Sequence, residues 1–357
     1  PHPSVVVVDE SSMMDQEAMF YLCRYIRRCM EDDIPVMLLM TGDVAQLEPV
    51  GSGYPFRDVL GETVGTVIPS TELDTIHRQG QSSAIIEASH DILDGNVPLV
   101  SEDVLADDNL ADDFYWHDYP NTPRGQPIDL WTYLSAVAGR ATTYTDGPEV
   151  TPEDVQLILP LRNPSSIDPA APHTRAANEE LQNIFAQERN VPIEAFTAAP
   201  LGDPDDHYTT WIALGDRVVH SGRNAYTAEA EDAPAHEPVM RGAVGRVVEA
   251  DLERGVRVDY PFMETVVTYH SPQEIGQLEL AYALTGHTSQ GSEFDVVAIC
   301  LPQDAGPTLM TRSWLYTALT RASRFLDLMA TQKRVRLCAT TDSGGARQTI
   351  LSSHVQL

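Results

Sequence analysis

The chain has 357 residues, which is enough for two or three domains with sizeable cores. No apolar run is long enough to cross a membrane, so we expect a cytoplasmic protein with no membrane partner. The net charge is −30, from 53 acidic and 23 basic residues with Lys333 as the only lysine, which argues against a generic basic surface for DNA.

Two explanations fit this charge. Either the substrate is not nucleic acid, or the protein is halophilic, because an acidic, lysine-poor surface stays hydrated in strong salt. We favour the halophilic explanation, because the acids concentrate in three segments away from the apolar strands: Glu102–Asp113, Asp203–Asp206 and Glu229–Asp232. Counterion release contributes little to DNA binding in strong salt, so a DNA-binding protein there would depend on stacking and directed hydrogen bonds.

Near the start of the chain, four consecutive valines, Val5–Val8, predict a strand buried on both faces of a parallel α/β sheet. Asp9 and Glu10 follow at its carboxyl end, where open α/β sheets bind ligands. One carboxylate can hold Mg²⁺, and the other can accept a proton from an attacking water. Two acids at a strand end are also common as solvated or structural residues, so this signal needs support from the rest of the chain.

A helix is predicted next, because Ser12 and Asp15 have capping-box spacing. Its apolar residues recur at helical spacing and predict a core-facing stripe: Met14, Ala18, Met19, Leu22, Tyr25, Ile26 and Cys29. Val36–Met40 is a second predicted strand, which completes a βαβ unit. The loop Gly42–Gly51 follows and would bring Gln46 beside the two acids, where it could orient a water or sense a phosphate.

Arg78 follows the predicted strand residues of this region, and an arginine there can reach a phosphate at the same sheet edge. A helix is expected from about Ser82 to Leu93. Residues 94–153 are rich in Asp, Pro and Gly, with one predicted helix at Ile128–Ala138, and are interpreted as a variable connection.

A second α/β region begins with the predicted strand Val155–Arg162 and a helix around Arg175–Gln187. Short alternating strands then predict a small barrel-like module: Ala213–His220, Gly245–Glu249, Val256–Tyr260 and Thr265–Tyr269. The α/β pattern returns at Leu278–Asp295 and continues with a strand, Val296–Leu301, and a helix, Ser313–Arg324. Taken singly, His287 would be a turn or core histidine and Arg321 a solvated helix charge.

Together, these stretches resemble superfamily 1 DNA helicases, specifically the RecD-like branch that moves 5′ to 3′. Val7–Met13 resembles the Walker B motif, and Gly42–Gly51 resembles the pattern Gly-Asp-x-x-Gln-Leu-x-Pro-Val-Gly. Ile76–Gln79 resembles the Arg-Gln motif of this family. Leu284–Phe294 resembles its Thr-x-His-Lys-Ser-Gln-Gly-Ser-Glu-Phe motif, and Tyr316–Ala322 resembles its Tyr-Thr-Ala-x-Thr-Arg-Ala motif. The last two motifs are highly specific. The stretches Gly215–Val218 and Arg241–Gly245, with Asn224 and Tyr226, resemble the small SH3-like module of these helicases.

The resemblance implies an α/β fold with two RecA-like lobes, the first incomplete, and a small SH3-like β-barrel inserted in the second. The first lobe would span residues 1–93, the variable connection 94–153, and the second lobe 154–210 and 276–336. The inserted barrel would be residues 211–275, and residues 337–357 would form a C-terminal tail.

The resemblance also implies a role for each motif residue, with ATP and Mg²⁺ as nucleotide and metal. Asp9 would hold Mg²⁺ and Glu10 would activate the hydrolytic water. Gln46, Arg78 and Arg321 would approach the γ-phosphate, while Gly291 and Glu293 would contact the nucleotide, the latter at its ribose. The residues implied to contact single-stranded DNA are Thr285, His287, Ser289 and Gln290.

Three departures from the family pattern stand out. His77 stands where phenylalanine is usual, and Thr288 replaces the usual lysine, which puts one contact to the DNA backbone in doubt. No Gly-x-x-x-x-Gly-Lys-Ser/Thr loop occurs anywhere, so the chain lacks its own triphosphate-binding loop. Because it begins at Pro1, we take it as a segment of something longer, whose missing part would be a preceding helicase segment or a second polypeptide.

The leading hypothesis is therefore part of an ATP-dependent 5′ to 3′ DNA helicase, inactive without the missing loop, with DNA repair and recombination among its expected pathways. One alternative is a non-catalytic DNA-binding or scaffolding remnant of such a helicase. Another is a metal-dependent nuclease built on Asp9, Glu10 and Asp43, which explains fewer of the motif residues.

Overall fold

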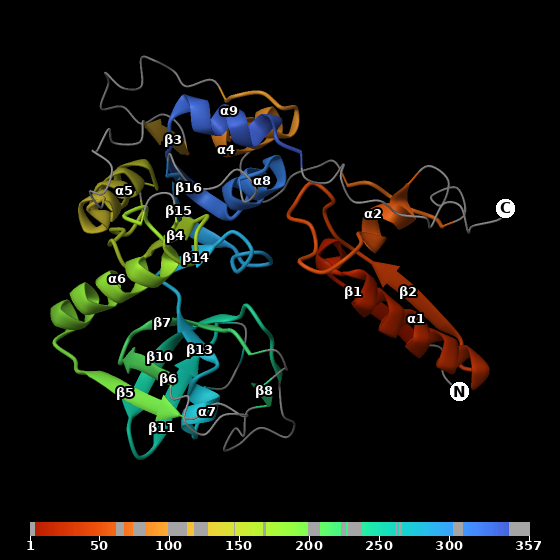
Figure 1. The fold of residues 1–357 in the computed structure, drawn as a ribbon, viewed down its shortest axis with the longest axis horizontal. Coiled ribbons are helices and arrows are strands. Elements are labelled where there is room, and N and C mark those ends of the chain that lie inside the picture. The colour runs from red at the N-terminus through yellow and green to blue at the C-terminus, as the bar shows by residue number, and fades with distance from the viewer. Residues whose placement is uncertain are drawn as a thin grey trace. The chain divides into compact units, whose positions relative to one another are not determined.

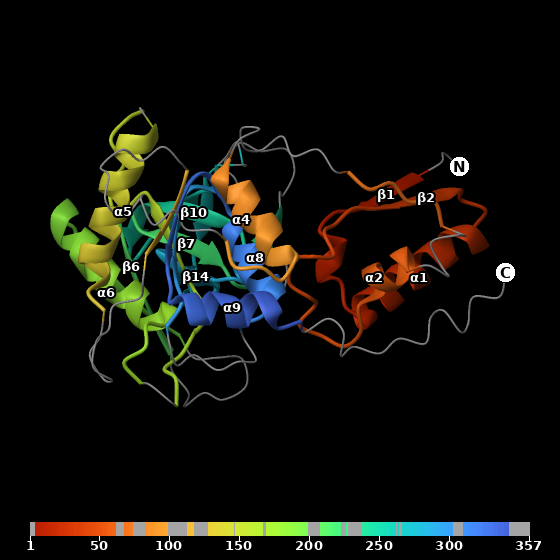
Figure 2. The same cartoon turned by 90° about the horizontal axis from the view of Figure 1, so that it is seen from above.

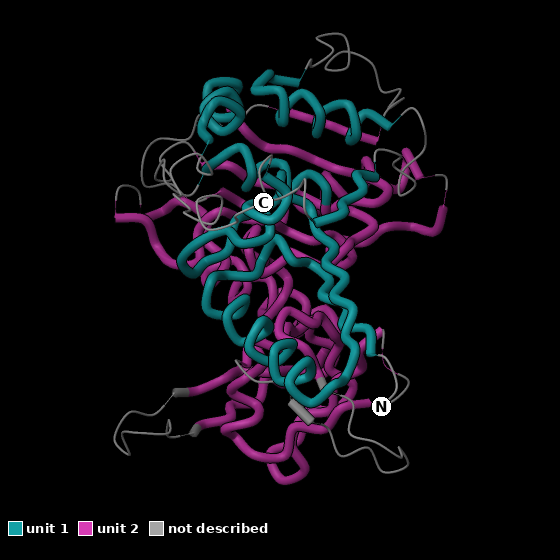
Figure 3. The backbone as a smooth tube through the Cα atoms, turned by 90° about the vertical axis from the view of Figure 1, so that its right-hand side faces the viewer, with its two compact units in different colours: residues 1–99, 307–320, 332–357 teal, residues 100–306, 321–331 magenta. Residues whose placement is uncertain are grey.

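The structure is a computed structural model. It describes residues 4–61, 68–73, 83–98, 113–117, 128–145, 147–166, 169–198, 208–222, 226–227, 238–261, 263, 266–302 and 310–342. The chain divides into two compact units (Figure 3): unit 1 is 1–99, 307–320 and 332–357, and unit 2 is 100–306 and 321–331. Within the described ranges, no helix combines the length and apolar character that crossing a membrane requires.

Unit 1 contains the βαβ element that the sequence predicts. Strands β1 (Ser4–Val8) and β2 (Val36–Met40) pair in parallel, from Ser4 opposite Val36 to Val8 opposite Met40. The short 3₁₀ helix η1 (Ser11–Met13) and α1 (Gln16–Glu31) connect them. Figure 2 shows α1 lying along one face of the strand pair.

The start of α1 differs from the prediction. Asp15 is the N-cap, and its carboxylate accepts a hydrogen bond from the backbone N–H of Ala18 at 2.8 Å. Ser12 instead lies buried in η1, and Met14 after it is extended, so the capping box assigned to Ser12 is wrong. The helix begins later because the chain first turns through η1 at the end of β1.

Burial of the strand pair also differs from the prediction. The side chains that alternate onto one face are exposed: Val5 61%, Val7 59%, Met37 66% and Leu39 49%. The helix stripe is no more than half-buried, and Ala18 and Tyr25 on it are exposed. The prediction of two covered faces is therefore wrong for the described part of the chain, where α1 covers one face alone.

The described part of unit 1 contains four more helices: α2 (Pro55–Leu60), α4 (Ala84–Leu93), α8 (Arg312–Leu319) and α9 (Gln332–Thr340). Helix α8 packs against both α4 and α9. The predicted helix through Arg324 is too long, because α8 ends at Leu319 and Thr320 turns its hydroxyl back onto the carbonyls of Tyr316 and Thr317. The apolar run after it forms a strand.

The core of unit 2 is a five-stranded parallel sheet (Figure 1), in the order β14-β4-β15-β16-β3. Its strands are β3 (Phe114–His117), β4 (Val155–Leu159), β14 (Ala283–Thr285), β15 (Phe294–Cys300) and β16 (Ala322–Met329). Helices α5 (Leu130–Thr145) and α6 (Thr174–Arg189) bury their apolar sides against the sheet in one cluster that includes Leu134, Leu157, Phe185 and Ala298. β3 and α5 come from the range expected to be a variable connection, and here they form an edge and a covering layer of the sheet.

A buried charge joins β3, α5 and β16. The Asp327 carboxylate, fully buried in β16, accepts hydrogen bonds from Tyr133 at 2.9 Å and from Nε of Arg140 at 3.0 Å. Nε2 of His117 lies 3.0 Å from its Oδ1. Three partners around one buried anion satisfy its oxygens and tie the edge strand to its helix.

Between β4 and β14 the chain forms a second, antiparallel sheet in the order β12-β11-β10-β7-β13. Its strands are β7 (Arg217–His220), β10 (Val244–Asp251), β11 (Gly255–Asp259), β12 (Val267–Tyr269) and β13 (Leu278–Leu280). The flanking elements are β5 (Ile193–Ala198) paired with β6 (Tyr208–Ala213), β8 (Tyr226–Thr227) paired with β9 (Pro238–Val239), and α7 (Pro272–Ile275). This sheet occupies the place of the predicted barrel, whose SH3-like identity stays a prediction.

The two sheets of unit 2 are joined by buried polar contacts. The Asp216 carboxylate, before β7, accepts hydrogen bonds from Tyr282 at 2.8 Å and from Arg189 at 3.0 Å. Burial is the largest influence on Asp216 and raises the pKa of its carboxyl, against the lowering by these donors. Of the predicted acidic segments, all but Asp113 lie outside the described residues.

Candidate functional site

The first group of predicted site residues lies at the carboxyl end of β1. Oδ1 of Asp9 accepts hydrogen bonds from the Thr41 hydroxyl at 2.5 Å and from the backbone N–H of Glu10 at 2.9 Å. These two bonds favour the carboxylate and lower the pKa of Asp9 below its ordinary 3.8. Asp9 is exposed and is therefore an anion at neutral pH that a cation can reach.

Glu10 has an unusual backbone conformation, with φ 49° and ψ 41° in the left-handed region. Non-glycine residues adopt this region rarely, and such outliers cluster at functional sites. The turn is fixed on its far side, where the Ser11 N–H donates to the Thr41 carbonyl at 2.7 Å and the Ser11 hydroxyl donates to the Val8 carbonyl at 2.8 Å.

The loop after β2 packs against this turn. A Cβ at Gly42 would lie 2.9 Å from the backbone nitrogen of Ser12, so only glycine allows the loop to approach so closely. The loop carries Gln46, whose Oε1 is buried without a hydrogen-bond partner in the described part of the chain. The hydroxyl oxygen of Ser12 is likewise buried with no partner among the described residues. Buried polar atoms of this kind call for a bound water, ion or ligand.

These residues fit a magnesium ion carried by a nucleotide. Mg²⁺ is usually held by one or two carboxylates together with substrate phosphates and waters. Asp9 supplies an accessible carboxylate just before the η1 turn that contains Ser12. Within the described ranges, no group of three His, Cys, Asp or Glu side chains forms a complete metal site. Among the described residues, Asp9 is the carboxylate that the sequence analysis expects to hold a metal.

Asp43 does not join Asp9 and Glu10 as a free carboxylate. Its Oδ1 accepts a hydrogen bond from the Ala45 N–H at 2.8 Å, and its Oδ2 accepts one from the Tyr316 hydroxyl at 3.0 Å. Asp43 thus helps to shape its loop and joins it to Tyr316.

Helix α8 meets the same loop through a second bond. The Leu47 N–H donates to the Thr317 hydroxyl at 2.9 Å, in a buried position. Two stretches some 270 residues apart in sequence, each matching a helicase motif, therefore lie in direct contact within unit 1.

The second group of predicted residues lies in unit 2, on the turn after β14. The Thr285 hydroxyl lies 2.9 Å from the Thr288 hydroxyl, and Ser289 is buried with its hydroxyl donating to the Gly286 carbonyl at 3.1 Å. His287 is exposed by surface area, yet nearby protein atoms desolvate its ring and lower the pKa of its imidazole below 6.5. This desolvation favours the neutral imidazole.

Arg321 holds the far end of this turn. It is 3% exposed, and its Nη1 donates to the Ser292 carbonyl at 3.0 Å. The prediction of a solvated helix charge is thus wrong for Arg321, which follows α8 and leads into β16. Arg78 and Asn224 lie outside the described residues.

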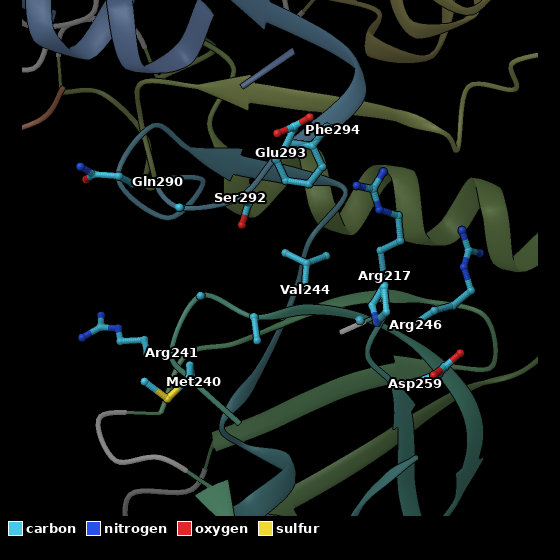
Figure 4. Close-up of a pocket in the computed structure, with 15 residues that line it drawn as sticks. Arg217, Met240, Arg241, Val244, Arg246, Asp259, Gln290, Ser292, Glu293 and Phe294 are labelled. Atoms are coloured by element: carbon cyan, nitrogen blue, oxygen red, sulfur yellow. The ribbon is translucent and has the colours of Figure 1, made fainter. Parts of the chain in front are cut away.

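A pocket of about 790 Å³ opens between this turn and the antiparallel sheet (Figure 4). Gln290, Gly291 and Glu293, which the sequence singles out, line one side. The opposite side carries residues to which the sequence gives no role in binding: Met240, Arg241, Arg246 and Asp259. Of the residues that line the pocket, Arg217 and the Arg241–Gly245 stretch had been noted only as parts of the predicted module.

Comparisons with known proteins show similarity to helicases. Residues 1–111 match the family described as AAA domain, and residues 280–329 match the family described as UvrD-like helicase C-terminal domain. The chain is 28% identical over 320 residues to the ATP-dependent RecD2 DNA helicase of Deinococcus radiodurans, covering 89% of this chain and 35% of that protein. It is 26% identical over 341 residues to the RecBCD enzyme subunit RecD of Mycobacterium tuberculosis, covering 94% and 51%.

Among solved structures, the Pif1 helicase from Candida albicans superposes with a TM-score of 0.52 at 18% identity, covering 93% of this chain and 73% of that one. This similarity supports the fold alone, an α/β architecture with a parallel sheet like that of RecA-like helicase lobes. The chain spans about a third to a half of the length of the two curated relatives described above.

Proposed function

We propose that this chain, which is a portion of a RecD-like superfamily 1 helicase, forms part of an ATP-driven enzyme that moves 5′ to 3′ along single-stranded DNA. In this proposal the turn at Asp9 and Glu10 is the hydrolytic half of a nucleotide site. The phosphate-binding loop that the chain lacks comes from another segment of the same protein or from a second polypeptide.

The proposal gives one task each to Asp9 and Glu10 on the turn after β1 and to Gln46 on the loop after β2. Asp9, kept ionised by Thr41 and the Glu10 N–H, holds Mg²⁺, which would neutralise charge on the phosphates. Glu10 accepts the proton of the attacking water, and Gln46 orients that water with its unpartnered side-chain oxygen.

Two arginines have a role in the same proposal. Arg78 and Arg321 would neutralise charge that develops on the transferring phosphoryl group, an effect worth about 10³–10⁵ in rate in related enzymes. Gly291 and Glu293 would contact the nucleotide from the turn that Arg321 holds, and Thr285, His287, Ser289 and Gln290 would contact DNA. High salt remains our preferred working environment, in view of the net charge of −30.

The observation that carries the proposal is the contact between the Gln46 loop and α8. The bonds from Tyr316 to Asp43 and from Leu47 to Thr317 connect the loop beside the acids to the helix that ends just before Arg321. A change at the phosphate end of the loop can therefore be passed to α8, as a nucleotide-driven motor requires.

The test is ATP hydrolysis by a joined protein, in which a segment with a Gly-x-x-x-x-Gly-Lys-Ser/Thr loop is fused in frame before Pro1. We expect hydrolysis in molar KCl that single-stranded DNA stimulates. Glu10→Gln should lower the DNA-stimulated rate by about 10²–10⁴, because it removes the general base.

Glu17→Gln is the matched control, since Glu17 is an exposed acid in the first turn of α1 with the same charge. It should leave the rate unchanged. A joined protein that binds DNA but hydrolyses no ATP would support the remnant hypothesis, and equal rates for the two variants would remove Glu10 from the mechanism.

A further inference from the structure

The pocket in unit 2 brings an arginine of the antiparallel sheet next to the turn proposed to contact DNA. In Figure 4, Arg241 and Gln290 extend toward the same side of the pocket, whereas Arg217 and Arg246 lie on the other side. The two elements are close at the backbone as well, because a Cβ at Gly242 would lie 3.9 Å from the Thr288 carbonyl oxygen.

The three pocket arginines differ in whether other residues of the chain already engage their guanidinium groups. Nη1 of Arg246 bonds the Glu153 carboxylate at 2.6 Å, and Nη1 of Arg217 bonds the Glu153 carbonyl at 3.1 Å. Arg217 is also buried, which lowers the pKa of its guanidinium to about 10. Arg241 is exposed and has no hydrogen bond or ion pair with another residue in the described ranges, so its charge is available to a ligand.

The turn beside Arg241 lacks a cation of its own. Thr288, at the position where the resembled helicase pattern has lysine, uses its hydroxyl internally with Thr285. In a chain with 23 basic and 53 acidic residues, an unpaired arginine directly beside that turn is an uncommon placement. It restores at this edge of the pocket the positive charge that Thr288 does not provide.

The remaining wall suits a base rather than a second phosphate. Met240 is 62% exposed next to Arg241, and the half-buried side chains of Val244 and Phe294 line the pocket behind it. Asp259, which also lines the pocket, repels additional phosphate groups. Proteins that hold single strands combine positive charge for the phosphates with side chains against which the bases pack.

Resting on the proposed function, we propose that Arg241 binds a phosphate of single-stranded DNA and that the pocket behind it, at Met240, receives the adjoining base. The antiparallel sheet is thereby a DNA-binding element that supplies the backbone contact missing at Thr288.

The experiment measures binding of fluorescein-labelled oligo(dT) to the 357-residue chain by anisotropy across a KCl series. Arg241→Ala should weaken binding about tenfold and reduce the slope of log affinity against log salt by about 1, as expected for one lost phosphate contact. Arg241→Lys should keep most of the slope. Met240→Ala should weaken binding with the slope unchanged.

Two variants elsewhere on the same sheet are the controls. Arg254→Ala removes a charge from an exposed side chain near Glu249, and Val248→Ala trims a side chain that is 42% exposed and does not line the pocket. Both should bind as the unaltered chain does.

The outcomes separate the two proposals. If the unaltered chain binds oligo(dT) and Arg241→Ala matches Arg254→Ala, the inference is wrong while the proposed function stands. If free dTMP competes as well as oligo(dT) at equal molarity, the pocket takes a mononucleotide and the inference is also wrong. If the unaltered chain and the joined protein both fail to bind DNA, the proposed function itself fails.

Discussion

The Tyr316 hydroxyl donates a hydrogen bond to Oδ2 of Asp43 over 3.0 Å, which fastens helix α8 to the loop after β2. Thr317, the next residue, accepts from the Leu47 N–H at 2.9 Å in a buried position. Successive residues of one helix thus engage two points of one loop. The pair fixes the loop's position more tightly than either bond alone, because both must break for it to move.

Thr317→Val is expected to destabilise the fold, because it leaves the buried Leu47 N–H without its acceptor at nearly unchanged side-chain volume. The cost should be about 1–3 kcal/mol, measured by urea unfolding. Thr340→Val is the control, since Thr340 is exposed and its hydroxyl bonds only carbonyls of its own helix. Equal stabilities of the two variants would mean that the contact to Leu47 contributes nothing.

Tyr316→Phe is expected to change catalysis more than stability. It removes the bond to Asp43 but keeps the ring, so unfolding should shift by about 1 kcal/mol. In the joined protein, kcat for ATP hydrolysis should fall while the KM for ATP stays near its original value, because the contact positions the loop and touches no substrate. A raised KM at constant kcat would contradict this role.

Asp327→Asn is expected to cost about 3–5 kcal/mol in urea unfolding, because it leaves the Arg140 guanidinium beside a neutral, fully buried partner. Asp295→Asn provides the comparison. Asp295 pairs with Arg324 at 3.8 Å in an exposed position, so its loss should cost about 0–1 kcal/mol. Similar costs for the two variants would show that burial of Asp327 does not matter.

Thr41→Val should raise the pKa of Asp9 toward its ordinary 3.8, since the Thr41 hydroxyl is the largest cause of its lowering. Because the pKa of Asp9 is lower in the folded chain, this interaction stabilises the fold fully at pH values above the ordinary pKa of 3.8. That stabilisation is lost as the pH falls through the lowered pKa of the folded state. A carboxyl-carbon NMR titration measures the shift. The pKa of Asp129, lowered by Thr132, is an internal reference that should not move.

Stability should rise with salt. The net charge of −30 makes the folded chain repel itself, and KCl screens that repulsion, so the thermal midpoint should increase between 0.1 and 3 M KCl, as followed by circular dichroism. A midpoint that is flat or falls over this range would contradict the halophilic interpretation.

Sequence patterns predicted the elements whose signals are local. The valine run gave β1, the alternating segments gave β10 and β11, and helical spacing gave α6 close to its observed ends. The patterns missed β3, whose four residues carry no alternation and become a strand only by pairing with β16. They also ran α8 too far, because its end depends on Thr320 turning its hydroxyl back onto the carbonyls of Tyr316 and Thr317.

The candidate site divides in the same way. Asp9, Glu10 and Gln46 were found because motif residues keep their spacing along the chain. Met240 carried no such signal and Arg241 was noted only as part of the predicted module, since their place at the pocket depends on how one sheet folds back to the turn after β14. The partners of Asp43 and Asp216 lie far away in sequence and could not be assigned from it.

The bare side of the β1–β2 pair has a practical consequence for anyone who makes this protein. Val5, Val7, Met37 and Leu39 offer a row of apolar side chains, and the two strands pair only with each other among the described residues. Strands of this kind are templates for ordered aggregation. Expressed by itself and concentrated, the chain will self-associate through this side, and a covering polypeptide will raise its yield as well as its activity.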